Sequence, residues 1–162
     1  MVTHTFTVEY TEITGISNLE DNDRQLLQKA WEACDSAYAP YSGFFVGASL
    51  RLENGMTVTG NNQENSAYPS GLCAERVALF SASSQYPGVA FESLAVVAKT
   101  EIFKLDNPAT PCGGCRQVIA EYEMLSGKPI RIILQGNSEK IWIVNGISNL
   151  LPLMFHGGDL KK

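Results

Sequence analysis

The sequence predicts a three-layer α/β/α fold, in which helices cover both faces of one mixed five-stranded sheet. The chain has 162 residues, 44% of them hydrophobic, which is enough for one domain with a substantial core. Helical and strand-like segments alternate, and helical segments separate the middle strands, as in crossover connections between parallel strands. We therefore expect one domain over residues 1–162. Residues 1–20 form an N-terminal arm, unless the first ten are a short edge strand.

The first half of the chain predicts one helix and one hairpin. The helix lies within residues 18–38, where acidic residues stand near the start and "APYSG" supplies the helix breakers that follow. The hairpin covers residues 44–62, in which apolar residues alternate and Asn54-Gly55 is a strong turn signal. The apolar positions at helical spacing are Leu27, Ala30, Trp31, Cys34 and Tyr38.

The second half of the chain predicts two long helices and three further strands. The helices begin near Cys73 and at Pro111, whose missing N–H is not needed in a first turn. The first ends near Ser84 and the second at Ser126-Gly127. The strands are "SLAVVAK" (93–99), "IRIILQ" (130–135) and "KIWIV" (140–144), and a short C-terminal helix follows from near Ser148.

Composition and charge exclude several classes of partner. The formal net charge is -5 and no basic stripe is present, which disfavours binding to a nucleic-acid polymer. No stretch reaches the roughly 20 apolar residues of a membrane span, so no membrane partner is expected. The first residues lack the pattern of a signal peptide. A cytoplasmic location follows by default, and cysteine clusters there more often bind metals or catalyse reactions than form disulfides.

Three cysteines are placed to share one metal ion. Cys112 and Cys115 form a C-x-x-C unit at a helix start, where positions i and i+3 share a face. Cys73 begins the other helix, and helices that follow strands of an α/β sheet start at one common edge. Three thiolates suit Zn²⁺ and leave its fourth tetrahedral position for water, as in catalytic sites. We interpret Cys34, on the apolar face of the first helix, as core.

Two charged residues beside Cys73 complete the predicted chemistry. Three thiolates and one Zn²⁺ carry a net charge of minus one, and Arg76, on the same helix face as Cys73, can offset this by hydrogen-bonding a sulfur. Arg116 and Gln117 are weaker candidates for that role. Glu75 is too close to Cys73 for easy chelation but can point into the same cavity as a proton shuttle.

Each of these residues also has an ordinary structural interpretation. The C-x-x-C unit alone is equally consistent with a redox dithiol or a structural clip. Cys73 alone fits a buried core cysteine, and Glu75 alone fits an acid that complements a helix dipole. The zinc interpretation is preferred because "CAE" (73–75) precedes "PCGGC" (111–115), the pattern of zinc nucleobase deaminases.

With these motifs in place, the chain resembles the small cytidine deaminases that act on free nucleosides and are typically homotetramers. The resemblance runs from about Tyr41 to Phe155. It rests on "PYSGFFVGA", "GNNQENSAYPSGLCAERVAL", "PCGGCRQV" and "LLPLMF". Three segments depart from the family pattern: the arm before Asp21, "AKTEIFKLDNPAT", which is slightly longer than expected for the family, and the tail "HGGDLKK" after Phe155.

The resemblance implies a role for each residue of the predicted site. It implies a cytidine-deaminase-like fold, one Zn²⁺ per chain, held by the three cysteines, and Glu75 as general acid and base. It also implies pyrimidine contacts, ribose contacts and an active site shared between subunits. The implied substrate residues are Phe44 on the pyrimidine, Asn62 and Glu64 on the 3′-hydroxyl, the Ala74 backbone, and Phe155 from a neighbouring subunit. Tyr68 would line the wall shared between subunits.

The expected activity is therefore hydrolytic deamination of cytidine and deoxycytidine to uridine and deoxyuridine, with release of ammonia, as in pyrimidine salvage. One alternative within the same chemistry is another cytosine nucleoside, such as an aminoacylnucleoside antibiotic. An alternative of another class is a non-catalytic zinc-binding module whose metal only stabilises an assembly.

Overall fold

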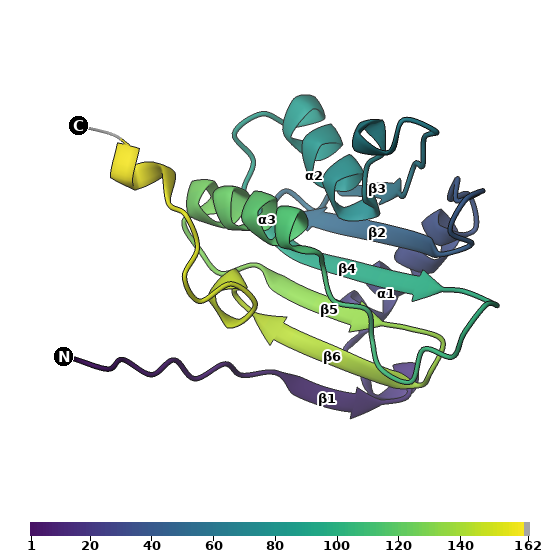
Figure 1. Cartoon of the computed structure of the whole chain (residues 1–162), viewed down its shortest axis with the longest axis horizontal. Helices are drawn as coiled ribbons and strands as arrows, with labels where there is room; N and C mark the ends of the chain where they lie inside the picture. The colour runs from purple at the N-terminus through teal and green to yellow at the C-terminus, as the bar shows by residue number, and fades with distance from the viewer. Residues whose placement is uncertain (161–162) are drawn as a thin grey trace.

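The computed structural model describes residues 1–160 and forms, within them, a six-stranded mixed sheet covered by three α-helices (Figure 1). The strand order across the sheet is β1-β6-β5-β4-β2-β3. The last two residues of the predicted 1–162 domain lie outside the described part. The strands are β1 (Thr11–Thr14), β2 (Phe45–Leu52), β3 (Thr57–Asn61), β4 (Phe91–Lys99), β5 (Arg131–Gln135) and β6 (Lys140–Asn145); the helices are α1 (Asp21–Cys34), α2 (Ala74–Gln85) and α3 (Gly113–Ser126).

The predicted three-layer arrangement is confirmed. Leu27, Ala30 and Cys34 of α1 pack with Ala95 and Val97 on one face of the sheet. On the other face, α2 and α3 pack against a second set of buried residues from β2, β4 and β5. Successive β4 residues therefore pack against helices on opposite faces of the sheet, because side chains alternate along a strand. The strand is buried on both faces, as its nearly continuous apolar sequence predicts.

The predicted strand count of five is wrong by one edge strand. β1 pairs antiparallel with β6, so that Thr11 faces Ile143 and Ile13 faces Ile141. The Tyr10 ring, just before β1, lies on the Trp142 ring with centroids 4.8 Å apart. The strand covers only four residues, mostly exposed, and is too short for alternation alone to distinguish a strand from an arm.

The predicted C-terminal helix is also wrong. Short 3-10 turns occupy Ile147–Asn149 and Gly157–Leu160, and no α-helix occurs after Ser126 in the described chain. Pro152 explains the interruption, because it has no N–H to donate and it disfavours helical backbone at Leu151. The segment instead runs beside α3, where Arg116 donates to the Leu150 carbonyl and Gln117 to the Phe155 carbonyl (Figure 1).

The sheet topology brings the starts of α2 and α3 to one edge. β2 pairs antiparallel with both β3 and β4, so β3 and β4 run in the same direction. α2 follows β3 and α3 follows β4. β4 and β5, which α3 connects, pair in parallel, as the crossover pattern predicts.

Among the described residues, no helix is both long and apolar enough to cross a membrane.

Candidate active site

Cys73, Cys112 and Cys115 meet where α2 and α3 begin. Cys73 is the residue before α2, and Cys112 is the residue before α3. The Sγ atoms of Cys73 and Cys112 are 3.8 Å apart, and those of Cys112 and Cys115 are 3.5 Å apart. All three sulfurs lie within 4.8 Å of one another. The predicted convergence of two helix starts on one point is thus observed.

The three sulfurs fit one zinc ion. Zn–S bonds of about 2.3 Å in tetrahedral geometry separate the sulfurs by about 3.8 Å, which matches the observed spacing. The N-termini of α2 and α3 both favour negative charge at this point. Cys34 takes no part, because it is buried with α1 on the opposite face of the sheet. The donor set is therefore the three thiolates that the sequence indicated.

Glycine at position 60 allows α2 to approach the sheet closely enough to place this site. A Cβ atom on Gly60 would lie 2.5 Å from the Ala78 nitrogen and 2.7 Å from the Ala74 carbonyl oxygen. Both atoms belong to the backbone of α2, which cannot give way as a flexible side chain would. The first turn of α2, which follows Cys73 and contains Glu75, therefore rests directly on β3.

Arg76 lies beside the cysteine sulfurs, as the helix spacing predicts. Its Nη2 donates to the Cys73 sulfur over 3.7 Å. The Cys115 thiol and then Arg76 hydrogen-bond to Cys73 and lower the pKa of Cys73 to about 5. The hydrogen bond to Cys73, together with burial, raises the pKa of Cys115. One thiolate is thus ready for the metal, and coordination releases the remaining thiol protons.

Arg116 and Gln117, the weaker candidates for a sulfur contact, use their donors elsewhere. Arg116 binds the Pro111 carbonyl at 2.7 Å and the Leu150 carbonyl at 2.7 Å. Gln117 Nε2 donates to the Phe155 carbonyl at 2.9 Å. Both side chains tie the C-terminal segment to the start of α3. Arg116 therefore fixes the backbone before Cys112, and Arg76 is the arginine that contacts a cysteine sulfur.

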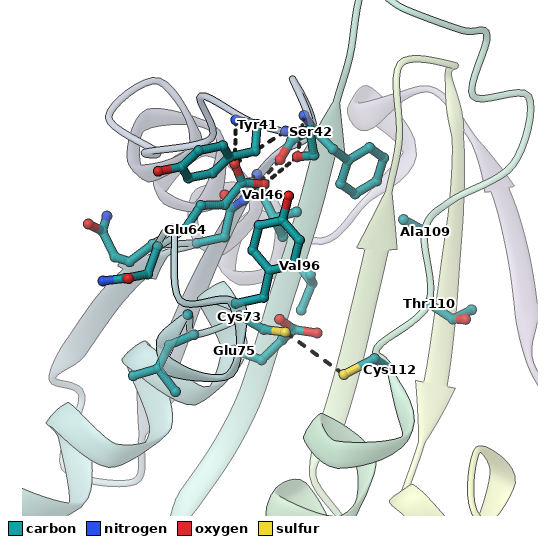
Figure 2. A pocket seen from close by; sticks show the side chains of 17 residues that line it. Tyr41, Ser42, Val46, Glu64, Cys73, Glu75, Val96, Ala109, Thr110 and Cys112 are labelled. Carbon is teal, nitrogen blue, oxygen red and sulfur yellow. Dashed lines mark hydrogen bonds between the residues drawn. The ribbon is translucent and has the colours of Figure 1, made fainter.

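Glu75 is buried beside the cysteines. Its side chain lies in the first turn of α2 and is only 4% exposed. The carboxylate lies next to the Cys73 sulfur at the base of a cavity (Figure 2). Burial, the largest cause, raises the pKa of Glu75, and the negative charge of Cys73 raises it further. A carboxyl group with a raised pKa exchanges protons more readily near neutral pH.

The cavity has a volume of about 620 Å³ and connects the cysteines to the loops after α1 and β3. Figure 2 shows Glu75, Cys73 and Cys112 at one end and Glu64 with the Tyr41–Ser42 segment at the other. A volume of this size suits a small-molecule ligand. Most of the predicted substrate residues line it: Phe44, Asn62, Glu64 and Tyr68, together with Cys73, Glu75 and Cys112.

Two predicted residues are placed differently. Ala74 is buried in the first turn of α2, between two residues that line the cavity, and does not itself line it. Phe155 is 61% exposed and lies outside the cavity of its own chain. Its exposure leaves the ring free to contact another subunit.

Asn62 and Glu64 organise the cavity wall. Asn62 Nδ2 donates to the Phe44 carbonyl at 2.9 Å, and Asn62 Oδ1 accepts from the Val46 N–H at 2.8 Å. Glu64 accepts from the backbone N–H groups of Tyr41, at 2.8 Å, and Ser42, at 3.2 Å, and from the Ser42 hydroxyl. These bonds, led by the one from Ser42, lower the pKa of Glu64. The carboxylate therefore faces the cavity as an anion.

A family comparison identifies this arrangement. Residues 20–126 match the family model described as the cytidine and deoxycytidylate deaminase zinc-binding region. The chain belongs to this deaminase family. The match spans the cysteines, Glu75 and the loops of the cavity, and it begins just after the N-terminal arm.

Relatives within the deaminase family are similar along most of their length. The cytidine deaminase of Sporosarcina psychrophila is 44% identical over 138 residues, covering 85% of this chain and 93% of the relative. That of Halalkalibacterium halodurans is 42% identical over 140 residues, covering 86% and 98%. The crystal structure of cytidine deaminase from Burkholderia pseudomallei has a TM-score of 0.71 at 37% identity, covering 85% of this chain and all of the other.

The cavity of this deaminase also contains residues that sequence reasoning missed. Tyr41 and Ser42 present the donors that fix Glu64, and Ala109 and Thr110 line the side next to α3. The motif "PYSG" was recognised, but its role in holding Glu64 depends on a contact 22 residues along the chain. A linear motif does not reveal such a contact.

Proposed function

We propose that the protein hydrolyses the exocyclic amine of cytidine and deoxycytidine, giving uridine or deoxyuridine and ammonia, as in pyrimidine salvage. The observation that carries the proposal is the buried carboxyl group of Glu75 beside three converging cysteine sulfurs, in a cavity sized for a nucleoside. The 44% identity to a cytidine deaminase supports the choice of substrate. A cytoplasmic location belongs to the same proposal, because thiolate ligands persist in a reducing compartment.

In the proposed reaction, Glu75 moves the protons. Zinc, when held by the three cysteines, supplies a Lewis acid that generates a water-derived nucleophile at neutral pH. Glu75 accepts a proton from the attacking water and gives it to ring N3 as the new C4–O bond forms. It then transfers the remaining water proton to the amine, so that the C4–N bond breaks and ammonia leaves while C4=O forms. Burial keeps the pKa of Glu75 high enough for it to give the proton back.

Asn62 and Glu64 support recognition of an unmodified sugar. Both line the far end of the cavity, and Glu64 is anionic there. A carboxylate can accept a hydrogen bond from a ribose 3′-hydroxyl but repels a phosphate. We infer a preference for free nucleosides over nucleotides and polymers.

A substrate panel tests this preference. Turnover should be highest on cytidine and deoxycytidine and at least about tenfold lower on cytosine, which has no sugar, and on 3′-CMP, whose phosphate would meet the Glu64 carboxylate. The readout is the loss of cytosine absorbance on mixing. An aminoacylnucleoside antibiotic belongs in the panel as the alternative substrate. A highest rate on 3′-CMP or on the antibiotic would contradict this account of the sugar site.

We further propose that the chain acts as a homotetramer with shared active sites, in which Phe155 enters a neighbouring cavity and Tyr68 lines the common wall. The exposure of Phe155, and its backbone anchor to Gln117, support this role.

Metal content and native mass together test the cofactor and the assembly. We expect one zinc per chain and a native mass of four chains, measured by elemental analysis and native mass spectrometry. Removing the zinc with a chelator should abolish turnover, and zinc should restore it. A zinc-loaded tetramer without turnover on any cytosine nucleoside would instead support the non-catalytic module.

A further inference from the structure

The loop between β4 and α3 places two exposed apolar side chains against the cavity wall. Ile102 and Phe103 are 70% and 53% exposed, yet both side chains contact the "PYSGF" segment (residues 40–44). The Phe103 ring stacks on Phe44, with centroids 6.0 Å apart and an interplanar angle of 12°. Ile102 Cδ1 occupies the space over Gly43, 2.7 Å from where a Cβ would be. Phe44 lines the cavity and Phe103 does not, so Phe103 supports Phe44 from outside.

The far side of this loop is fixed to the rest of the fold. The turn between β5 and β6 holds it through three side-chain hydrogen bonds, of 3.1, 3.3 and 3.0 Å. These run from Asn137 to the Thr100 carbonyl, from Ser138 to the Asp106 carbonyl, and from Lys140 to the Asn107 side chain. The loop that carries Phe103 is thus anchored, although Phe103 and its sequence neighbours Ile102 and Lys104 are exposed.

Phe44 has a fixed backbone, since its N–H donates to the Ser42 hydroxyl and its carbonyl accepts from Asn62, but no hydrogen bond can hold its ring. Phe44 follows Gly43, whose φ of +60° is accessible mainly to glycine. The Phe44 side chain is only half-buried, and Tyr41 and Ser42 of the same segment are exposed. An aromatic ring that is free to rotate loses entropy when a ligand orders it. A stacked partner removes part of that loss before the ligand arrives.

We propose that Phe103 is a positioning residue that sets the affinity for the pyrimidine by holding the Phe44 ring. The proposal rests on the proposed function, in which Phe44 packs on the base. Phe103 acts on binding and leaves the proton transfers of Glu75 unchanged.

Steady-state kinetics of Phe103→Ala test the proposal. We expect KM for cytidine to rise about three- to tenfold, the range of one aromatic pair, with kcat within about twofold of the wild type. The Kd for uridine, measured by calorimetry, should rise by the same factor. Phe103→Leu should recover part of the loss. The matched control is Phe6→Ala, which removes an equally exposed phenylalanine from the N-terminal arm and should leave KM unchanged.

A double-mutant cycle shows whether Phe103 acts through Phe44. Adding Phe103→Ala to Phe44→Ala should raise KM little beyond Phe44→Ala alone, because the supported ring is already gone. An independent, multiplicative rise would overturn the proposal. The proposal would also be overturned if Phe103→Ala left both KM and the uridine Kd unchanged. A fall in kcat in both Phe103→Ala and Phe103→Leu would overturn it as well. Failure of the wild type to deaminate cytidine or bind uridine would instead overturn the proposed function, and the pyrimidine role of Phe103 with it.

Discussion

Glu75→Gln is expected to lower kcat for cytidine by at least about 10²- to 10⁴-fold while zinc remains bound. Glutamine is nearly isosteric with glutamate but cannot accept a proton from water and return it to N3 or to the amine. The cysteine donors are untouched, and the side chain stays in its buried place in the first turn of α2. Turnover and zinc content, measured on the same preparation, give the result.

The matched control for this change is Glu53→Gln. Glu53 is exposed and pairs with Lys128 on the surface, 2.9 Å away, so its neutralisation should leave kcat unaltered. Near-normal turnover by the zinc-loaded Glu75→Gln protein would rule out Glu75 as the proton carrier. A loss of zinc in step with activity would show that Glu75 acts mainly by stabilising the metal site.

The metal centre was predictable from the sequence because its geometry is largely local. A helix places Cys112 and Cys115 on one face by their spacing alone, and Arg76 on the same face as Cys73. The meeting of Cys73 with the other two required only the rule that helices following strands of like direction start at one edge of the sheet. The observed sulfur separations agree with both inferences.

The sugar end of the cavity was less predictable because it depends on contacts between distant segments. Glu64 is fixed by Ser42, and Asn62 by the backbone of Phe44 and Val46. These pairs are set by the hairpin register and by the loop after α1, neither of which follows from residue types. The Phe103–Phe44 stack is harder still, because Phe103 lies in a loop without periodicity.

A second prediction of large effect concerns the packing of α1 on the sheet. Gly47→Ala is expected to lower the free energy of unfolding by about 3 kcal/mol. The new Cβ would lie 2.6 Å from the Cys34 backbone nitrogen and closer still to the Ala30 carbonyl oxygen. Both are helix backbone atoms, so relief requires moving α1 or β2 as a whole. Denaturant unfolding, at fixed protein and zinc concentrations, measures the change.

Ser49→Ala, two residues along β2, is the matched control. Its hydroxyl is fully buried and has no hydrogen-bond partner among the described residues, so its removal should be neutral or stabilising. An unchanged midpoint for Gly47→Ala would contradict the close approach of α1. Displacement of β2 should also reach the active site, since Val46, the residue before Gly47, donates its N–H to Asn62. We therefore expect a raised KM for cytidine in whatever fraction of Gly47→Ala folds, because the packing that stabilises the sheet also holds the cavity wall in place.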